Sequence, residues 1–168
     1  MRYVLVFLAI MVLAALQSSV FPLIRLSSGQ PNLVFLLVVA WAIDADWNES
    51  MLWTIVGGLC QDLLSIAPIG TSILPLVLAV FAVKMALMQV KGLSFIVYMV
   101  VAVVGTLVAL IFLFIMLGVT GYGIDSVPTV RYFLLPSLAY QIVTAVPMYM
   151  VVRWFNRQTT PRRGFQMP

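Results

Sequence analysis

Residues that carry chemistry are scarce in this chain. It contains no histidine, a single cysteine, Cys60, and only 8% charged residues. Neither an intrachain disulfide nor a Cys/His metal site can therefore form. Intramembrane proteases of the Ser–His type and HExxH metalloproteases are excluded as well, because both need histidine. We predict that the protein is not an enzyme and that it has no catalytic residue, metal site or cofactor.

Acidic residues are also few, and most of them lie together. The five are Asp44, Asp46, Glu49, Asp62 and Asp125. The first three form a tight loop that could bind a cation, although such a loop is usually a solvated connection. Asp62 differs from them because it lies inside an otherwise apolar run.

Apolar residues dominate what remains of the composition. They make up 64% of the 168 residues, whereas a soluble domain has about 45–50%. So large an apolar share places the chain among membrane proteins. The net charge of +4 is explained by basic residues retained in cytoplasmic loops. We therefore expect membrane lipid, and no nucleic acid, around the protein.

The apolar residues fall into six segments that we predict to be membrane-spanning helices. They are residues 3–24, 32–43, 51–67, 71–90, 93–118 and 131–154. The first could instead be a cleaved signal peptide, but its apolar core is long and its cleavage site is poor. The third is short for a span, so a re-entrant segment is the alternative.

The predicted fold is an all-α integral membrane protein, a compact bundle of about six transmembrane helices. Residues 1–155 form a single polytopic transmembrane domain, and residues 156–168 form a basic, disordered cytoplasmic tail. Six spans place both termini on one side of the membrane. If that side is cytoplasmic, seven basic residues lie inside and only Arg25 and Arg131 lie outside, in agreement with the positive-inside rule.

Tryptophan positions agree with this orientation. Indole rings anchor well at a membrane interface. Near the inner interface we expect Trp41, Trp47, Trp53 and Trp154.

The stretch 54–79 is the predicted packing centre of the bundle. Gly58 and Asp62 share one helix face because they are four residues apart. A charge in such a run should face protein or water rather than lipid, and glycine on the same face lets another backbone approach. The residues assigned to packing or partner binding are Gly57, Gly58, Asp62 and Gly70. The candidate charge partners of Asp62 are Lys84, Arg25 and Arg131.

Small residues also recur on the fourth and fifth segments. The stripes are Ala79, Ala82 and Ala86 in the fourth, and Ala102, Gly105 and Ala109 in the fifth. A very short turn joins the two segments, which makes them antiparallel neighbours. The stripes would let the two helices pack closely, although alanine and glycine are also simply common in such helices.

Basic residues gather near the end of the chain. They are Arg153, Arg157, Arg162 and Arg163. Such a group could hold anionic lipid. The positive-inside rule alone explains it equally well.

Three short motifs together resemble a known family. The first is Gly57-Gly58-Leu-Cys-Gln-Asp62-Leu-Leu, followed by a break and Gly70; the others are Gln17-Ser-Ser-Val-Phe-Pro22 and Pro31-Asn32-Leu. With the chain length and the basic tail, they resemble the rod shape-determining protein MreD family. The adjacent glycines depart from the family, whose members often space glycines along the helix.

The resemblance implies a fold similar to the substrate-binding subunits of energy-coupling-factor vitamin transporters. It also implies a non-enzymatic scaffold role in the bacterial elongation machinery. The implied partners are MreC, the RodA glycosyltransferase and a class B penicillin-binding transpeptidase, and the implied location is the inner membrane. A substrate-binding subunit of a vitamin transporter is the alternative. Such a subunit would need several polar groups converging near its outer face, where the chain offers Asp62, Gln61, Arg131, Asn32 and Gln141.

Overall fold

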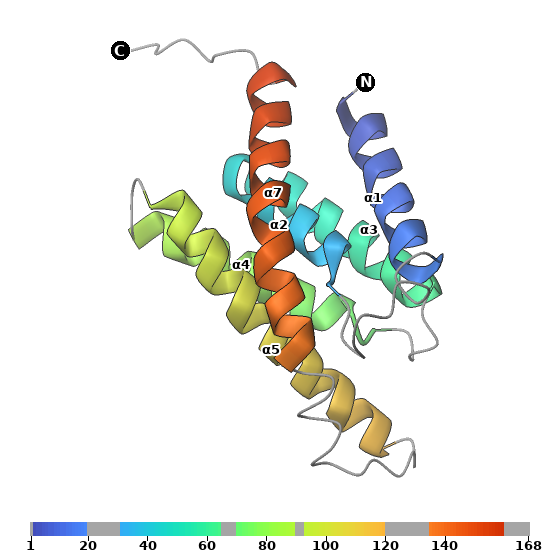
Figure 1. Cartoon of the computed structure of the whole chain (residues 1–168). Helices are drawn as coiled ribbons and strands as arrows, with labels where there is room; N and C mark the ends of the chain where they lie inside the picture. Colours follow the sequence, from blue (N-terminus) through green and yellow to red (C-terminus); the bar gives the residue numbers. More distant parts are fainter. Residues whose placement is uncertain (1, 20–30, 65–69, 90–92, 120–134, 160–168) are drawn as a thin grey trace.

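The computed structural model describes residues 2–19, 31–64, 70–89, 93–119 and 135–159, and these residues form helices without any strand (Figure 1). The helices are α1 (Arg2–Ser19), α2 (Leu33–Asp44), α3 (Trp47–Leu64), α4 (Ile73–Gln89), α5 (Ser94–Val119) and α7 (Leu135–Thr159). Each of the six expected segments overlaps one of these helices, so the all-α prediction is confirmed for the described residues. α7 continues to Thr159; the predicted disordered tail is therefore wrong for residues 156–159, and its remainder lies outside the described residues.

Helix length and composition distinguish α5 from the other described helices. Its segment Ser94–Leu113 has 20 residues and, within the described parts of the chain, is the one segment long and apolar enough to cross a membrane. Three shorter apolar helices cover Tyr3–Ser19, Leu33–Asp44 and Ile73–Gln89. By length and apolar composition, one of the about six predicted transmembrane helices is thus supported.

The central element of the bundle is α2. It contacts α1, α3, α4, α5 and α7, and all its residues from Val34 to Ala42 are buried. Its sequence is apolar on every side, which is the pattern of a helix enclosed by others. The stretch 54–79 packs against this helix, so the prediction that it is itself the packing centre is wrong.

The short length of α2 creates a problem for its ends. With 12 residues, the helix is about 18 Å long at 1.5 Å per residue, whereas the hydrocarbon core of a bilayer is about 30 Å thick. Free N–H and C=O groups at the ends of such a helix have no access to water when apolar helices surround it. Side chains from those helices must therefore satisfy them.

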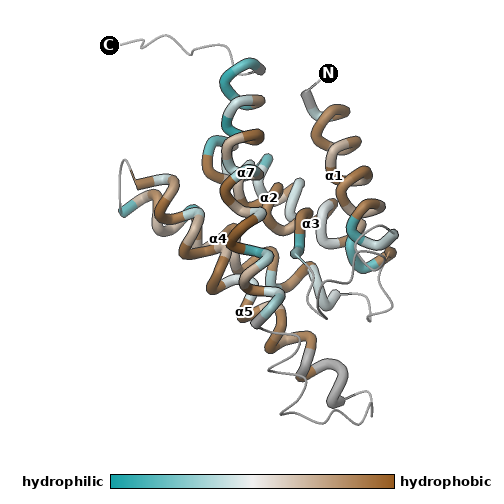
Figure 2. Tube along the Cα trace, viewed as in Figure 1, coloured by the Kyte–Doolittle hydropathy of each residue, from teal (hydrophilic) through white to brown (hydrophobic). Residues whose placement is uncertain are grey.

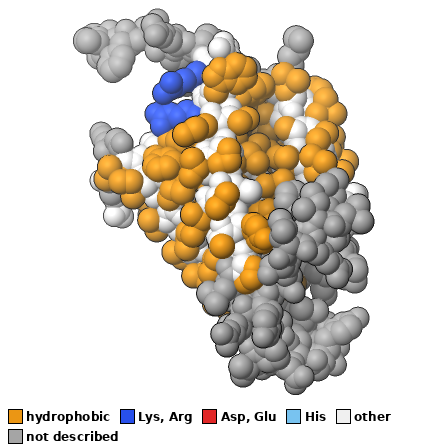
Figure 3. All heavy atoms as spheres, viewed as in Figure 1, with side chains coloured by type: hydrophobic (Ala, Val, Ile, Leu, Met, Phe, Trp, Pro, Cys, Tyr) orange, Lys and Arg blue, Asp and Glu red, His pale blue; other side chains and the backbone are white. Residues whose placement is uncertain are grey.

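The surrounding helices expose mainly apolar side chains. Figure 3 shows an almost continuous apolar surface over the described part of the face in view. Among the most exposed side chains are Leu63 (73%) and Val143 (70%). Hydrophilic residues gather in the last turns of α7 (Figure 2), on the side of the molecule where α1 begins (Figure 1). This distribution is that of a bundle surrounded by lipid.

Two sequence predictions about packing are only partly right. Ala79 and Gly105 do lie between α4 and α5, since a Cβ added at Gly105 would be 3.3 Å from the Ala79 Cβ, but Ala82 is exposed. Trp41 and Trp53 are each only 3% exposed. These two tryptophans are core residues rather than interfacial anchors. Among the tryptophans, the exposed ones are Trp47 (39%) and Trp154 (64%).

Candidate functional site

The two adjacent glycines of α3 face different helices. A Cβ added at Gly57 would lie 2.9 Å from Val38 Cγ2 and 3.3 Å from Val34 Cγ1, both on α2. A Cβ added at Gly58 would lie 2.8 Å from Ile73 Cα, at the start of α4. The missing side chains therefore allow α3 to approach α2 on one side and the backbone of α4 on the other.

Asp62 lies one turn after Gly58 and holds the start of α4. Its Oδ2 accepts a hydrogen bond from the backbone N–H of Gly70 (2.6 Å), and its Oδ1 accepts one from that of Ser72 (2.9 Å). The Thr71 hydroxyl donates to Oδ1 as well (3.3 Å). The carboxylate thus accepts from backbone N–H groups of the turn that leads into α4, close to the positive end of the helix.

The environment of Asp62 is protein. The residue is 3% exposed, as expected for a charge that must avoid lipid. Gly70, which binds its carboxylate, has a φ of +102°, a backbone conformation that favours glycine. We call this set of residues, Gly57, Gly58, Asp62 and Gly70–Ile73, the α3–α4 junction. The four residues that the sequence assigned to packing or partner binding thus lie together in it.

The predicted charge partners of Asp62 have different positions. Lys84 is not one of them, because its ammonium group donates to the carbonyl oxygen of Ala45, the residue that follows α2. Arg25 and Arg131 lie outside the described residues. A cation at this carbonyl is favourable, since the C-terminus of a helix carries a partial negative charge.

Side-chain amides cap the opposite end of α2. Asn32 is the N-cap, and its Oδ1 accepts from the backbone N–H of Phe35 (2.9 Å). The backbone N–H groups of Asn32 and Leu33 donate to Gln141 Oε1 (2.8 Å) and Gln17 Oε1 (3.0 Å), respectively. These bonds supply acceptors to the N–H groups of Asn32, Leu33 and Phe35 at the start of the helix.

A fourth amide comes from α3. Gln61 donates through Nε2 to Asn32 Oδ1. We call Gln17, Asn32, Gln61 and Gln141 the amide cluster; it joins α1, α3 and α7 to the start of α2. In this cluster, Gln141 is fully buried, and its Nε2 is a donor that has no hydrogen-bond partner among the described residues.

Only part of this arrangement is predictable from the sequence. The polar groups predicted near the outer face include Gln61, Asn32 and Gln141, but they do not include Gln17, and no cap of α2 was predicted. A usable signal was present, because an amide in an apolar segment must find a hydrogen-bond partner inside the protein. The structure shows that these groups bond largely to one another and to the backbone of α2.

The junction and the amide cluster are two sides of one motif. Gly57 and Gln61 are four residues apart and face α2, while Gly58 and Asp62 are four residues apart and face α4. Residues at this spacing lie on one face of a helix. The Gly-Gly-Leu-Cys-Gln-Asp segment therefore forms two parallel contact faces on α3, each with a small residue and a polar residue.

The predicted acidic loop is shorter than expected, because Asp44 is the last residue of α2 and Glu49 lies in the first turn of α3. The Trp41 indole N–H donates to Glu49 Oε1 (3.2 Å), and Asn156 Nδ2 of α7 donates to Asp44 Oδ2 (3.4 Å). Within the parts of the chain that the structure describes, no three acidic or cysteine side chains gather as a metal site would require.

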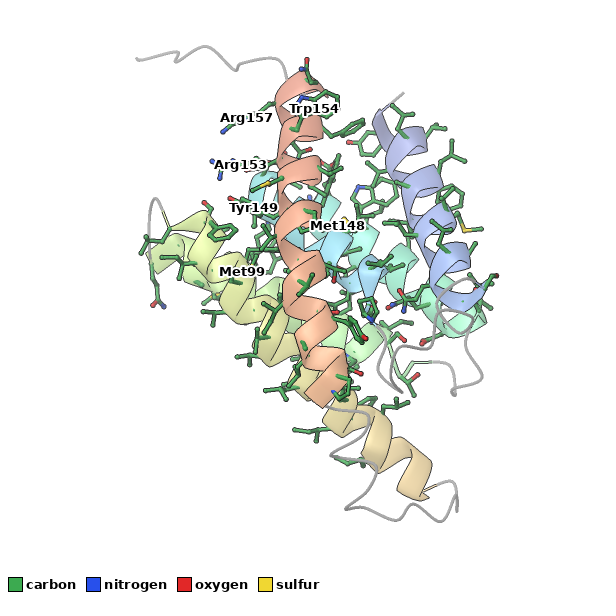
Figure 4. All side chains as sticks on the ribbon, in the orientation of Figure 1. Met99, Met148, Tyr149, Arg153, Trp154 and Arg157 are labelled. Carbon is green, nitrogen blue, oxygen red and sulfur yellow. The ribbon has the colours of Figure 1, made fainter. Side chains whose placement is uncertain are left out.

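Of the four arginines predicted to bind anionic lipid, two lie in α7. Arg153 is half-buried and Arg157 is exposed. Arg162 and Arg163 lie outside the described residues. The described arginines are at the end of the molecule opposite the α3–α4 junction, next to the start of α5 (Figure 4).

Comparison with known proteins gives one match. The family model for the rod shape-determining protein MreD matches residues 1–159. No curated protein and no solved structure is significantly similar to the chain, so the likeness to vitamin-transporter subunits remains a prediction. The match covers every described helix, and the chain belongs to the rod shape-determining protein MreD family.

Proposed function

We propose that the protein is a non-enzymatic scaffold of the bacterial cell-elongation machinery. In this proposal it binds MreC and, with it, supports peptidoglycan synthesis by the RodA glycosyltransferase and the class B penicillin-binding transpeptidase. The observation that carries the proposal is the family match over residues 1–159. A family that determines rod shape acts where the cell wall is extended.

Polar side chains inside the bundle bind mainly other groups of the protein, which supports a scaffold function. Both carboxylate oxygens of Asp62 bind the start of α4. The amide cluster caps α2, which leaves few polar groups to bind a small molecule, as a vitamin carrier would require. A partner would instead meet apolar helix faces and short turns.

In this proposal the α3–α4 junction supports the interface from inside. Gly57, Gly58 and Asp62 are all buried, so a partner could not touch them without displacing α2 or α4. The outward side of the same helix carries exposed apolar side chains, among them Leu52 (49%), Ile55 (50%), Leu59 (40%) and Leu63 (73%). Rigid packing at the junction would keep this outward side in a fixed position.

Co-purification with MreC tests the proposal. The tagged protein would be extracted in mild detergent with MreC co-expressed, and an unrelated single-pass membrane protein would serve as the control prey. We expect stoichiometric recovery of MreC and none of the control. Recovery of a transporter ATPase or of a bound small molecule in place of MreC would contradict the scaffold function.

Surface variants locate the interface without disturbing the core. Leu59→Trp and Leu63→Trp change the exposed side of α3, and Val104→Trp and Val108→Trp change that of α5, where the side chains are 51% and 37% exposed. If MreC binds over the junction, only the α3 variants should reduce its recovery. Loss through the α5 variants alone would place the interface on the other side of the bundle.

A further inference from the structure

Two arginines project from the last turns of α7. Arg153 and Arg157 are four residues apart, so they share one face of the helix, and Figure 4 shows both side chains extending to the same side of α7. Figure 3 shows their positive charge beside the apolar surface, with no acidic side chain among the described residues of that face. Like charges at this spacing repel one another, so an anion bound between them would be stabilised.

The guanidinium group of Arg153 is held from inside the bundle. It donates to the Tyr149 hydroxyl, and its Cζ lies 5.6 Å from the centre of the Tyr149 ring. Both interactions restrict the long arginine side chain. The Arg153 side chain is therefore largely ordered before a ligand binds, which lowers the entropy cost of binding.

Tyr149 is in turn fixed by α5. Its ring lies 5.2 Å from that of Phe95 and 5.1 Å from that of Tyr98, between centroids. Tyr98 is fully buried, and its hydroxyl donates to the carbonyl oxygen of Leu36 in the central helix (3.4 Å). A chain of contacts thus runs from α2 through Tyr98 and Tyr149 to the guanidinium group.

The remaining donors of Arg153 suit a phosphate group. A guanidinium group has five N–H donors in a planar fork, and the Tyr149 hydroxyl accepts from one nitrogen, Nη1. Arginine binds phosphate oxygens through two parallel bonds. Arg157, one turn further along, supplies a second cation for the same anion.

The surroundings indicate that the phosphate belongs to a lipid. The arginines lie where α7 changes from apolar to hydrophilic (Figure 2). Met150, three residues before Arg153 and seven before Arg157, lies on their face of α7 and is 62% exposed. Trp154, between the two arginines in the sequence, is 64% exposed. An exposed apolar side chain below a pair of cations matches the acyl chain and headgroup of an anionic phospholipid.

We propose that Arg153 and Arg157 form a binding site for the headgroup of an anionic phospholipid, with Tyr149 positioning the first arginine. The lipid would fix the last turns of α7 relative to the start of α5 in a membrane of the right charge. This site goes beyond the scaffold function and does not depend on MreC binding.

Native mass spectrometry of the full-length protein in detergent tests the site. The probes are phosphatidylglycerol and phosphatidylcholine with identical acyl chains. We expect the wild type to bind phosphatidylglycerol selectively. The double variant R153Q/R157Q should lose about 30-fold in affinity, at about 1 kcal/mol for each of two cations, with phosphatidylcholine binding unchanged.

Matched variants separate the site from the general charge of the chain end. R162Q/R163Q removes the same charge from two arginines that the sequence assigns to the same basic group, and it should weaken phosphatidylglycerol binding much less than R153Q/R157Q does. Tyr149→Phe keeps the ring but removes the hydroxyl acceptor, and it should weaken binding less than the double variant. If R153Q/R157Q does not fold, R153K/R157K keeps both charges without the planar fork and should still weaken binding.

Three results would overturn the proposal. The first is wild-type affinity for phosphatidylglycerol in the folded arginine variants. The second is an equal loss of affinity in R162Q/R163Q, which would assign the effect to charge alone. The third is displacement of the lipid by inorganic phosphate at equal concentration, which would make the ligand a free anion.

Discussion

At the residue scale, the adjacent glycines of α3 solve two packing problems at once. Successive residues on a helix are rotated by about 100°, so Gly57 faces the side chains of α2 and Gly58 faces the backbone of α4. Glycines spaced along one helix face would serve only one of these contacts. The adjacency, which set this chain apart from the family pattern, thus has a direct structural reason.

We expect Gly58→Ala to destabilise the protein. The added methyl group would lie 2.8 Å from Ile73 Cα, and a backbone atom can move only if α4 moves. The free energy of unfolding should fall by about 1–2 kcal/mol, because overpacking outweighs the better helix propensity of alanine. Unfolding in mixed micelles by increasing amounts of denaturing detergent, followed by circular dichroism, measures this difference.

The neighbouring glycine provides the control for that experiment. Gly57→Ala would meet the methyl groups of Val38 and Val34 at 2.9 and 3.3 Å. These contacts are with side-chain atoms, which can yield by a few tenths of an ångström without moving the backbone of α2, so the loss of stability should be smaller. A Gly58→Ala variant as stable as the wild type would contradict the close approach of α3 and α4.

A second residue-scale prediction concerns Asp62. Asp62→Leu leaves the N–H groups of Gly70 and Ser72 without their acceptor, and a buried donor without a partner costs about 1–3 kcal/mol. We expect a loss of about 2–5 kcal/mol, with faster hydrogen exchange at both amides. Asp62→Asn keeps one oxygen acceptor and should lose less.

Asp46 is the matched control for Asp62. It is exposed, and Asp46→Asn keeps a side-chain oxygen at the residue before α3 while it removes one charge near Lys84, so stability should fall by no more than about 1 kcal/mol. If Asp62→Leu leaves the hydrogen exchange of Gly70 and Ser72 unchanged, the carboxylate does not hold the start of α4.

At the scale of the element, α2 is a short helix capped at both ends by side chains. The amide cluster accepts from N–H groups at its start, and Lys84 donates to the carbonyl oxygen of Ala45 at its other end. Backbone groups are bound from α1, α4 and α7, and Gln61 of α3 binds the side chain of the N-cap residue, Asn32. Each of these helices is thereby held to the centre by a hydrogen bond as well as by packing.

Asn32→Ala tests the cap at the start of α2. It removes the acceptor of the Phe35 N–H and also that of Gln61 Nε2. An ordinary N-cap is worth about 0.5–2 kcal/mol, and the second buried donor adds about 1–3 kcal/mol. We expect a loss of about 2–4 kcal/mol in the same unfolding experiment.

Asn32→Asp distinguishes loss of the cap from a general effect of substitution. Its carboxylate can accept both hydrogen bonds and also suits the positive end of the helix. It should retain most of the wild-type stability. Equal losses in both variants would show that the acceptor at residue 32 does not hold the start of α2.

Helix positions could be predicted from the sequence because apolar runs of this length leave few alternatives. The central role of α2 was missed, because its short apolar run was interpreted as an incomplete span rather than as an enclosed helix. The amide cluster was missed in part for a different reason. Asn32 and Gln141 are 109 residues apart, and a single glutamine in an apolar helix carries no periodic signal that names its partner.

The groups that bind Asp62 and Lys84 could not be predicted from the sequence. Lys84 is a cation and Asp62 is an anion, and both lie in apolar segments. In the structure Asp62 binds the turn before α4, whereas Lys84 binds the carbonyl oxygen after the end of α2. Free N–H and C=O groups at helix termini attract charges as effectively as an opposite charge does. Sequence alone does not show which helix ends lie within reach.

At the scale of the whole molecule, three basic residues lie at one end of the bundle, and the amide cluster lies with Asp62 at the other. Lys84, Arg153 and Arg157 lie at the end where α7 finishes, whereas the amide cluster and the α3–α4 junction lie at the other. In our proposal the first end is cytoplasmic, because basic residues are retained there. The start of α1 and the end of α7 lie on the same side of the molecule (Figure 1), which agrees with the predicted even number of crossings.

Reporter fusions test this orientation in cells. Because the positive-inside rule places both chain ends in the cytoplasm, a green fluorescent protein fused after residue 168 should fluoresce, and alkaline phosphatase at the same place should be inactive. Phosphatase inserted within residues 20–30 or 120–134 should be active, since these segments would face the periplasm. Phosphatase inserted within 90–92 serves as an internal cytoplasmic control and should be inactive. An active phosphatase after residue 168, with an inactive one in 120–134, would reverse the orientation and would also place Arg153 and Arg157 in the outer leaflet.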